Sequence, residues 1–469
     1  MGEERSRAAR IADQLAERIQ EGTLAPGTRL ASIRAAAREY GVSKNTVVDA
    51  YDQLVATGYL DPRRGSGFYV APVRRRRASA PTEHFAEAMD LISLLREQLN
   101  KNYAVRAGDG RPPTSWMGRS EVGRYLSRGN RQGQDTDDFE YGRPEGFTPL
   151  RETIARTLSE RAIPAGAEQI LLTFGANHAM DLLVRHLVEP GDPVLVETPG
   201  YYPFFGKLRL QKARIIGVTR TGDGPDLDEL DRLARLHRPR LLFLQPMAHN
   251  PTGTSMSLSA MHRLLQLAQS HDLLLIEDDP FADILPRATP HLAALDALER
   301  VIYLGTFSKT LSAGVRCGYI AAGQQLIASL TDIKMLTVVN TSGATERMIH
   351  DLIVRGRYRR HLTRLRDRVA QASAQAVTAL ESIGLTEITA PTGGYYLWCP
   401  LPAGVDDVAL AQRASEEGIF LAPGTLFSQS ETPASPGIRI NIAHADHPKL
   451  LDFLAREVTG VGRADRETV

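Results

Sequence analysis

The feature that most constrains the fold of this chain is a repeated alternation of short apolar runs with longer stretches of helical pattern, which begins near residue 141. Each run is rich in Val, Ile and Leu and has the length of a buried strand. This alternation predicts an α/β fold with a mainly parallel sheet that is covered by helices on both faces. In such a fold, ligand-binding groups lie at strand ends and in the adjoining loops. The six runs are 169–173, 193–197, 214–218, 240–244, 273–277 and 301–304.

The first 72 residues follow a different pattern. Apolar residues recur at helical spacing in residues 4–20, which predicts an amphipathic helix. Ser32 and Ser43 precede two further short helical patterns, and we expect both to act as N-caps. Residues 59–70 are expected to form two short strands around a basic turn that contains glycines. Three helices and a basic hairpin predict a winged helix-turn-helix domain over residues 1–72.

Positive charge is concentrated at the start of the chain. Residues 1–77 contain 14 Lys and Arg against 9 Asp and Glu, a net charge of +5, whereas all 469 residues together carry +1. A basic head on a body of net charge −4 predicts that the head binds a polyanion. Residues 73–88 include four consecutive arginines and are expected to form a basic linker, which either follows DNA phosphates or is simply a solvated tether. Residues 89–469 form the expected effector domain.

Several classes of protein are disfavoured by the same sequence. Cys317 and Cys399 are too few for a disulfide framework, and the charged first residues lack the apolar core of a signal peptide. No apolar run has the length of a membrane span. We therefore expect a cytoplasmic protein with no membrane partner and no metal site.

The stretch 303–320 carries the clearest sign of chemistry. Small and hydroxylated residues surround Lys309, and Arg316 follows seven residues later between glycines. An amine can bind an aldehyde, while Thr306, Ser308 and Arg316 can together hold a dianionic phosphate. Pyridoxal 5'-phosphate is the cofactor that needs both groups, with Lys309 as its Schiff base. The alternative is a solvated lysine in a serine-rich turn.

The head resembles the GntR class of bacterial regulators in its segments APGTRLASIR, GVSKNTVVDAYDQL and GSGFYV. This resemblance implies binding of double-stranded DNA, and Val48 stands where several relatives have an arginine. A recognition helix reads only a few base pairs, so we expect a dimer on two half-sites of a promoter operator. The alternative is a three-helix protein-interaction module with solvated charges. The implied DNA-contact residues are Arg34, Ser43, Lys44, Asn45, Thr46, Arg64 and Gly65.

The body resembles the fold-type I aminotransferases from about residue 91 to the end. YGRPEGFTPLR at 141–151 is similar to the first of that family's motifs. In TFGANHAM a strand ends at a glycine and a helix begins, so free backbone N–H groups can hold a phosphate. By resemblance, Gly175, Ala176 and Asn177 hold the cofactor phosphate, although such a turn is also common as a plain α/β connection.

Three further residues are implied to contact the cofactor ring. Tyr201 is at the position of a ring-stacking aromatic, or else is a core tyrosine. In HNPTG, Asn250 is implied to bind the phenolic oxygen, with His249 as a turn residue. In IEDDPF, Asp278 is implied to keep the pyridine nitrogen protonated, so that the ring acts as an electron sink. Asp279 is expected to cap the strand end or to be solvated there.

Two positions bear on the reaction. Relatives have a tyrosine two or three residues after the acid, where this chain has Pro280 and Phe281, so efficient transamination is in doubt. Arg439, in PGIRINIAH, matches the residue that binds a substrate carboxylate with two hydrogen bonds. The alternative for Arg439 is a surface arginine on an edge strand.

A GntR-like head joined to an aminotransferase-like body resembles the MocR regulators. This resemblance implies a homodimer, head-to-tail, that binds DNA and pyridoxal 5'-phosphate and senses an amino compound through an aldimine at Lys309. Two alternatives remain open. One is a working aminotransferase with a fused DNA-binding head, and the other is a regulator for which pyridoxal 5'-phosphate is itself the effector.

Overall fold

The structure is a computed structural model that describes residues 7–20, 23–63, 66–71, 96, 99, 103–118, 122–127, 140–286, 288–389, 391–402, 404–429 and 436–459. The chain divides into two units, Met1–Ala80 and Pro81–Val469, each of which is described by itself. The predicted linker at 73–88 lies outside the described residues. No helix in the described part of the chain is long and apolar enough to cross a membrane.

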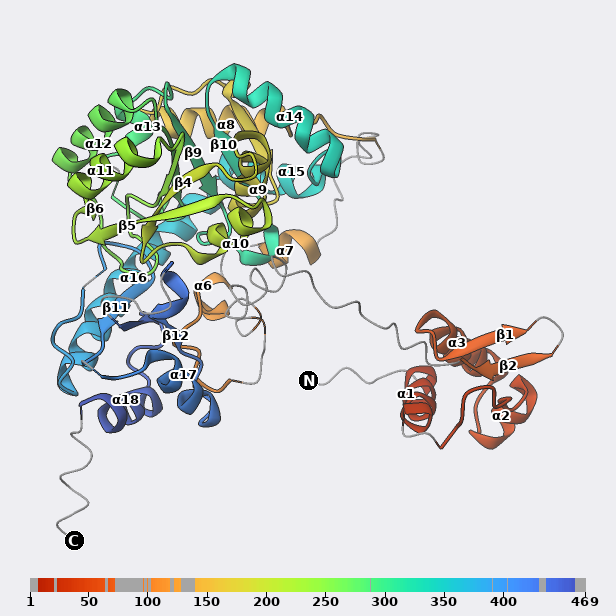
Figure 1. Cartoon of the computed structure of the whole chain (residues 1–469). Coiled ribbons are helices and arrows are strands. Elements are labelled where there is room, and N and C mark those ends of the chain that lie inside the picture. The colour runs from red at the N-terminus through yellow and green to blue at the C-terminus, as the bar shows by residue number, and fades with distance from the viewer. Residues whose placement is uncertain are drawn as a thin grey trace, which may run out of the picture. The chain divides into compact units, whose positions relative to one another are not determined.

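The head has the predicted three helices followed by a hairpin (Figure 1). The Ser32 hydroxyl accepts from the backbone N–H of Ala35 at 3.3 Å, and the Ser43 hydroxyl accepts from that of Thr46 at 3.2 Å, so both predicted N-caps are confirmed. The antiparallel strands pair Leu60 with Val70. The elements are α1 (Arg7–Gln20), α2 (Ile33–Glu39), α3 (Lys44–Ala56), β1 (Leu60–Arg63) and β2 (Gly67–Val70).

The small core of the head follows from the helical spacing of its apolar residues. Ile11 and Leu15 of α1 are buried in one cluster with Val47 and Tyr51 of α3. The Tyr51 hydroxyl donates to the Ala31 carbonyl at 3.0 Å, which ties α3 to the segment before α2. These contacts pack α3 against α1 and hold it to the segment before α2, while Lys44 and Asn45 in the first turn of α3 stay exposed.

The body is built on an eight-stranded sheet in the order β3-β10-β9-β8-β7-β4-β5-β6. Five of the predicted strands, β5, β4, β7, β8 and β9, pair in parallel with their neighbours. The sixth, β3, pairs only with β10, which is antiparallel to both β3 and β9, and the short β6 is antiparallel to β5. The mainly parallel α/β sheet is therefore confirmed. The strands are β3 (Ile170–Thr173), β4 (Pro193–Thr198), β5 (Arg214–Thr221), β6 (Gly224–Pro225), β7 (Leu241–Leu244), β8 (Leu274–Asp279), β9 (Val301–Thr306) and β10 (Gly318–Ala321).

Helices cover both faces of this sheet (Figure 1). In β7, Leu242 and Leu244 belong to one core cluster, whereas Leu241 and Phe243 belong to the other, as the period of two along a strand requires. The run at 214–218 was expected to be buried, but much of β5 is partly exposed because only the two-residue β6 lies beyond it. The helices of this part are α8 (Thr148–Ser159), α9 (Ala176–Leu187), α10 (Tyr202–Leu210), α11 (Leu227–His237), α12 (Leu258–Ser270), α13 (Leu292–Leu295), α14 (Gln324–Val338) and α15 (Gly343–Val354), with 3₁₀ turns η2 (Ala167–Gln169) and η3 (Ala313–Val315).

A long helix, α16 (Arg357–Ser382), leads from the large sheet to a smaller lobe (Figure 1). This lobe holds a three-stranded antiparallel sheet in the order β11-β13-β12. Arg439 therefore lies on the central strand and is 1% exposed, which excludes the alternative of a surface arginine on an edge strand. The remaining elements are β11 (Tyr396–Pro400), β12 (Ala422–Pro423), β13 (Gly437–Asn441), α6 (Thr114–Met117), α7 (Val122–Ser127), α17 (Asp407–Glu416), η4 (Gly424–Phe427), α18 (Pro448–Leu454) and the π-helical turn η5 (Ala455–Thr459).

Candidate functional site

Lys309 lies in the loop after β9, at the end of the sheet where the parallel strands have their carboxyl ends. Its amine donates to the carbonyl oxygen of Gly110, a residue of a segment far away in the sequence. The hydroxyl of Tyr395 donates to the backbone carbonyl of Lys309 at 2.7 Å. The loop is thus held from two sides, and the lysine amine is directed toward the segment that contains Gly110.

The residues predicted to hold a phosphate come together next to this loop. Gly175 is the N-cap of α9 with φ 81°, so the first backbone N–H groups of the helix, those of Ala176 and Asn177, have no acceptor within it. Arg316 donates to the Ser308 hydroxyl at 3.3 Å and to the Phe174 carbonyl at 3.0 Å. A Cβ at Gly175 would lie 3.0 Å from a terminal nitrogen of Arg316. Helix N–H groups, hydroxyls and a guanidinium therefore share one small region suited to a dianion.

Asp278 lies in β8, buried and 2% exposed. One of its carboxylate oxygens accepts from the side-chain amide of Gln245 at 2.6 Å, whereas the other has no hydrogen-bond partner among the described residues. Burial raises the pKa of Asp278 to about 7, although the Gln245 hydrogen bond opposes that rise. A buried carboxylate oxygen without a donor is suited to a cationic ring N–H, such as a protonated pyridine nitrogen.

Gln245, which belongs to none of the sequence motifs, links two of the predicted residues. Its side-chain oxygen accepts from the backbone N–H of Asn250 at 3.0 Å, while its amide donates to Asp278. The Asn250 side-chain oxygen in turn accepts from Arg439 at 2.8 Å. A continuous chain of hydrogen bonds thus joins Asp278 to Arg439. The position of Gln245, directly after the apolar run at 240–244, was the available signal.

Arg439 is held in a buried and aromatic environment. Besides Asn250, it donates to the Gly108 carbonyl at 2.7 Å, and its guanidinium lies over the rings of Tyr396 and Phe427 at 4.7 and 5.0 Å. Its Nε has no hydrogen-bond partner within the described ranges. Such a guanidinium can bind a carboxylate only where one enters the site and replaces these neutral acceptors.

The segment that begins at Gly108 closes this side of the site. A Cβ at Gly108 would lie 2.5 Å from the backbone carbon of Leu421, so the position requires glycine. The Asn441 side chain donates to the carbonyls of Asp109 and Arg111, both at 2.8 Å. The carbonyl between these two, that of Gly110, accepts from Lys309 and also from the Tyr396 hydroxyl, at 2.9 Å for the tyrosine. Tyr396 therefore stands beside the lysine amine, which the sequence did not indicate.

Tyr201 is the N-cap residue of α10 and is partly buried. Its ring stacks on Phe243, with 6.3 Å between ring centroids and 26° between planes. Burial raises the pKa of the Tyr201 hydroxyl, and the carboxylate of Asp278 raises it further. The phenol thus stays neutral close to Asp278, with one part of the ring against the core.

Asp279 was expected to cap or solvate the strand end, and this expectation is wrong. The side chain is buried, accepts from the Tyr303 hydroxyl at 3.2 Å and lies 3.1 Å from His291 Nδ1. Burial alone favours the neutral imidazole, but Asp279 and Glu277 raise the pKa of His291 to about 10. Successive side chains of a strand point to opposite faces, so Asp279 enters the core beneath the sheet while Asp278 faces the lysine.

The departure at Phe281 leaves an apolar contact where relatives have a hydroxyl. Phe281 is buried, with its ring edge-on to Tyr395 at 5.1 Å and to Tyr396 at 5.6 Å between centroids. Pro280 precedes it in the buried loop that follows β8. Neither residue supplies a hydroxyl near Lys309.

In the head, the exposed face at the start of α3 carries the residues expected to contact DNA. Lys44 and Asn45 are exposed in its first turn, and Arg34 is exposed on α2. The Ser43 hydroxyl is occupied by its cap and by Thr46, at 2.8 Å between the two hydroxyl oxygens. Arg64 and Gly65 lie outside the described residues.

Arg29 is a further basic residue of this surface that the sequence analysis did not name. It is exposed, forms a β-bridge with Tyr69 of the hairpin, and its side chain would lie 3.5 Å from a Cβ at Gly67. Arg63 stacks over the ring of Tyr69 at 4.3 Å. The place of Arg29 in the APGTRL segment was the available signal.

Comparison with known families agrees with this division of the chain. Residues 7–70 match the model described as bacterial regulatory proteins, gntR family, and residues 108–456 match that of aminotransferase class I and II. The chain belongs to the MocR-type regulators. The probable rhizopine catabolism regulatory protein MocR of Rhizobium meliloti is 30% identical to it over 480 residues, which cover 97% of this chain and 95% of that protein.

Other relatives of this MocR-type regulator are enzymes. The 2-aminoadipate transaminase of Thermus thermophilus is 35% identical over 335 residues, 70% of this chain and 81% of that protein. The crystal structure of LysN, the alpha-aminoadipate aminotransferase from Thermus thermophilus, has a TM-score of 0.72 and 29% identity, and covers 81% of this chain and 99% of that one. LysN was crystallised with N-(5'-phosphopyridoxyl)-L-leucine. The family depends on pyridoxal 5'-phosphate, which is therefore the cofactor of this body, and the GntR domain binds DNA.

Proposed function

We propose that this MocR-type regulator binds a promoter operator through its head and that a small amine or amino acid, or pyridoxal 5'-phosphate itself, controls this binding from the body. The observation that carries the proposal is the buried Asp278, whose free carboxylate oxygen lies in the same site as Lys309. A buried, unpaired carboxylate is unfavourable unless a ligand pairs with it. Its presence in a chain with a DNA-binding head supports a ligand-sensing body.

The chain offers one donor for each part of the cofactor. The amine of Lys309 would hold the aldehyde carbon, Asp278 the pyridine nitrogen, Asn250 the phenolic oxygen and Tyr201 one face of the ring. When bound, pyridoxal 5'-phosphate supplies an electron-withdrawing ring conjugated to the carbon that bears the amine. The residues assigned to its phosphate are Gly175, Ala176, Asn177, Thr306, Ser308 and Arg316.

The effector is assigned to the space between Lys309 and Arg439. An amino acid brings an amine that competes with Lys309 and a carboxylate that competes with the Gly108 carbonyl and the Asn250 oxygen for Arg439. Displacement of the Gly108 carbonyl would free a segment that is held between the small lobe and Lys309. A change in the preferred conformation of the body would follow from these differential contacts.

The body is expected to have little turnover. Phe281 has only ring contacts and no hydroxyl that could bond the phenolic oxygen of the cofactor, so one group that would tune the imine at Lys309 is missing. The competing function is an active aminotransferase with a fused head, which the similarity to 2-aminoadipate transaminase favours. Production of keto acid in multiple turnovers separates the two.

A homodimer, head-to-tail, is part of the proposal. Met335, Leu336 and Val339 at the end of α14 are exposed, with Leu336 89% exposed. Tyr141, 83% exposed, lies close to them in the fold, since a Cβ on the adjacent Gly142 would be 3.1 Å from the Asn340 amide. A contiguous exposed apolar patch is typical of a surface between subunits. A dimer also supplies two heads for two half-sites.

The experiment combines cofactor trapping with operator binding. Borohydride reduction of the cofactor-loaded protein should leave the cofactor covalently attached, and Lys309→Ala should abolish this attachment and the effect of any amine on operator affinity. Lys449→Ala, an exposed lysine on α18, is the matched control. Asn45→Ala should lose operator binding while keeping the cofactor. A covalent adduct in Lys309→Ala, or rapid keto-acid production by the native protein, would overturn the proposal.

A further inference from the structure

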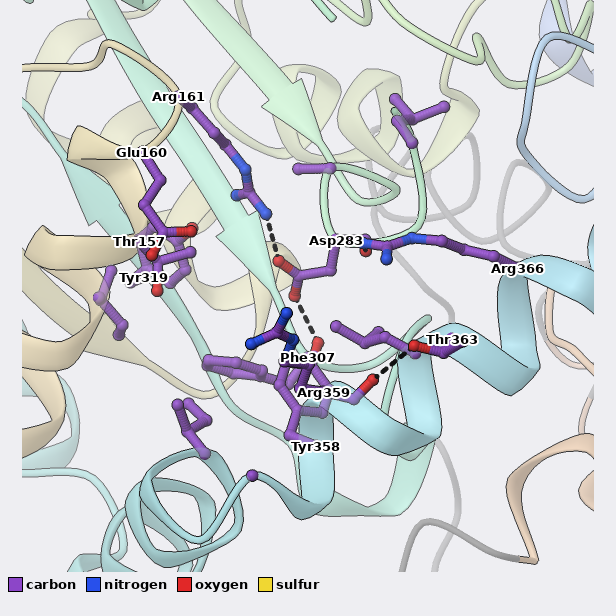
Figure 2. Close-up of a pocket in the computed structure, with 16 residues that line it drawn as sticks. Thr157, Glu160, Arg161, Asp283, Phe307, Tyr319, Tyr358, Arg359, Thr363 and Arg366 are labelled. Atoms are coloured by element: carbon purple, nitrogen blue, oxygen red, sulfur yellow. Dashed lines mark hydrogen bonds and ion pairs between the residues drawn. The ribbon is translucent and has the colours of Figure 1, made fainter. Parts of the chain in front are cut away.

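A second cavity lies behind the lysine loop, apart from the Lys309 and Arg439 side chains. It has a volume of about 470 Å³ and is enclosed by α8, the segment after β8 and the first turns of α16. This volume is within the range of sites for small molecules. Phe307 and Leu362 are apolar residues of its lining. Arg161 and Arg366 approach Asp283 from opposite sides (Figure 2).

Asp283 is already saturated by the protein. One carboxylate oxygen accepts from Arg161 Nη2 and the other from the Tyr358 hydroxyl, while the Asp283 backbone carbonyl accepts from Arg366 Nη2 at 2.6 Å (Figure 2). These contacts fix both guanidinium groups at the cavity wall. The carboxylate therefore positions Arg161 and the backbone carbonyl positions Arg366, while both carboxylate oxygens are already bound within the protein.

Each of the two arginines has a buried N–H group that makes no hydrogen bond to the described residues. Arg161 Nη1 and Arg366 Nε are buried and have no hydrogen-bond partner among the residues that the structure describes. Unpaired donors on a buried cation are costly, because the group has lost its water without gaining an acceptor. Arg359 adds an exposed third positive charge to the lining, whose described residues include two carboxylates, those of Glu160 and Asp283. The cavity thus lacks one negative charge.

We propose that this cavity binds a small carboxylate with an apolar body, at a site distinct from the one that contains Lys309. The carboxylate would accept from Arg161 Nη1 and Arg366 Nε, and the apolar body would lie against Phe307 and Leu362. Among the described residues, no lysine lines the cavity, so a ligand has no lysine amine to exchange with there. A ligand without an amino group therefore suffices. The site therefore selects a different chemical class from the effector of the proposed function.

A residue of the cavity lining contacts the residue that follows Lys309, the lysine on which the proposed function depends. The Tyr358 hydroxyl, which contacts Asp283, is also 2.6 Å from the hydroxyl of Thr310, the residue after Lys309. His361, also on α16, lies 2.9 Å from the Thr310 carbonyl. Phe307, two residues before Lys309, packs edge-on against Tyr358 at 5.8 Å between ring centroids. A ligand that shifts Tyr358 or Phe307 would consequently shift the lysine loop, which couples the two sites.

The test is calorimetric titration of the full-length, cofactor-loaded protein with phenylacetate, which has a carboxylate and an aromatic body but no amine. Phenylacetate should bind, and neutral phenylacetamide should bind at least about tenfold more weakly, because it lacks the charge that the arginines require. Arg366→Gln should weaken phenylacetate binding by about tenfold or more. If Arg366→Gln fails to fold, Arg359→Gln takes its place, because it changes an exposed side chain of the lining. Arg359→Gln should also weaken phenylacetate binding, by a smaller factor.

Two controls locate the bound phenylacetate. Arg355→Gln removes an exposed arginine of the same region that does not line the cavity, and it should leave the affinity unchanged. Arg439→Lys should also leave it unchanged, whereas a loss in Arg439→Lys alone would place phenylacetate in the effector site and overturn the inference. Absence of binding, or equal binding of the amide, would overturn it as well.

The coupling has its own readout and rests on the proposed function of Lys309. Phenylacetate should change the visible absorbance of the bound cofactor, and Tyr358→Phe should bind phenylacetate with a much smaller change. Binding without any spectral change would refute the coupling, while the binding data would still decide whether the cavity is a site. If Lys309 holds no cofactor, the same titrations on the full-length protein as purified still decide whether the cavity binds phenylacetate.

Discussion

Asp278→Asn is expected to stabilise the cofactor-free body at pH 8 and to weaken cofactor binding at the same time. The carboxylate is buried, with one oxygen bound by Gln245 and the other without a donor among the described residues. Burial raises its pKa from 3.8 to about 7, and a difference of roughly three pKa units corresponds to about 4 kcal/mol of unfavourable free energy for the ionised folded state. Asparagine keeps the hydrogen bond to Gln245 and carries no charge.

The pH dependence of the free energy of unfolding determines the direction in which Asp278→Asn changes stability. Because the folded pKa of Asp278 lies above the unfolded one, the folded body binds more protons than the unfolded chain between about pH 4 and pH 7. The free energy of unfolding of the native sequence should therefore decrease as pH rises through this window, and the full cost is present above it. The advantage of Asp278→Asn should be small at pH 4 and largest at pH 8.

Urea unfolding at several pH values measures this difference. The two tryptophans of the chain, Trp116 and Trp398, both lie in the body, so their fluorescence reports on that unit alone. At pH 8 the midpoint of the variant should be higher by on the order of 1 M urea. Its affinity for pyridoxal 5'-phosphate should fall by about tenfold or more, because a charged hydrogen-bond partner is lost.

A purely structural role of Asp278 would give the opposite result. In that case the asparagine would destabilise the body at pH 8, or its effect on the urea midpoint would not change between pH 4 and pH 8. Either outcome would refute the reasoning. If Asp278 serves cofactor binding and not folding, its replacement should raise stability and lower cofactor affinity together.

Three other predictions concern separate parts of the chain. Gly175→Ala, at φ 81° and with its new methyl group 3.0 Å from Arg316, should lower cofactor affinity by about tenfold, as absorbance titration can measure, while the secondary structure seen by circular dichroism is kept. Lys44→Ala should lessen the slope of log affinity for DNA against log salt by about one, and an unchanged slope would remove Lys44 from the interface. His291, whose pKa is raised to about 10, contributes stability that is complete below about pH 6.5 and is lost as pH rises through 10, so the melting temperature should fall between about pH 6.5 and pH 10, and it should fall less in His291→Asn.

The sequence by itself determined the elements and the residues that act within a few positions of one another. Helix starts at Ser32 and Ser43 depend on a hydroxyl and a backbone N–H three residues away, and the apolar runs of the sheet specify their own strands. Lys309 and Asp278 could be picked out because each lies at or just after the end of such a run. These signals are local, so they can be read without the fold.

Only the tertiary structure decided how the site is completed. Arg439 is 189 positions from Asn250 in the chain, and the carbonyl of Gly108 reaches Arg439 across 331 positions. Gln245 gained its role because β7 and β8 are neighbours, and Asp279 was misjudged because its partner His291 approaches from the far face of the sheet. The cavity beside Thr310 arises likewise from α16 packing against a loop that it never adjoins in sequence. Contacts of this kind depend on which elements pack together, and no spacing within a single segment encodes them.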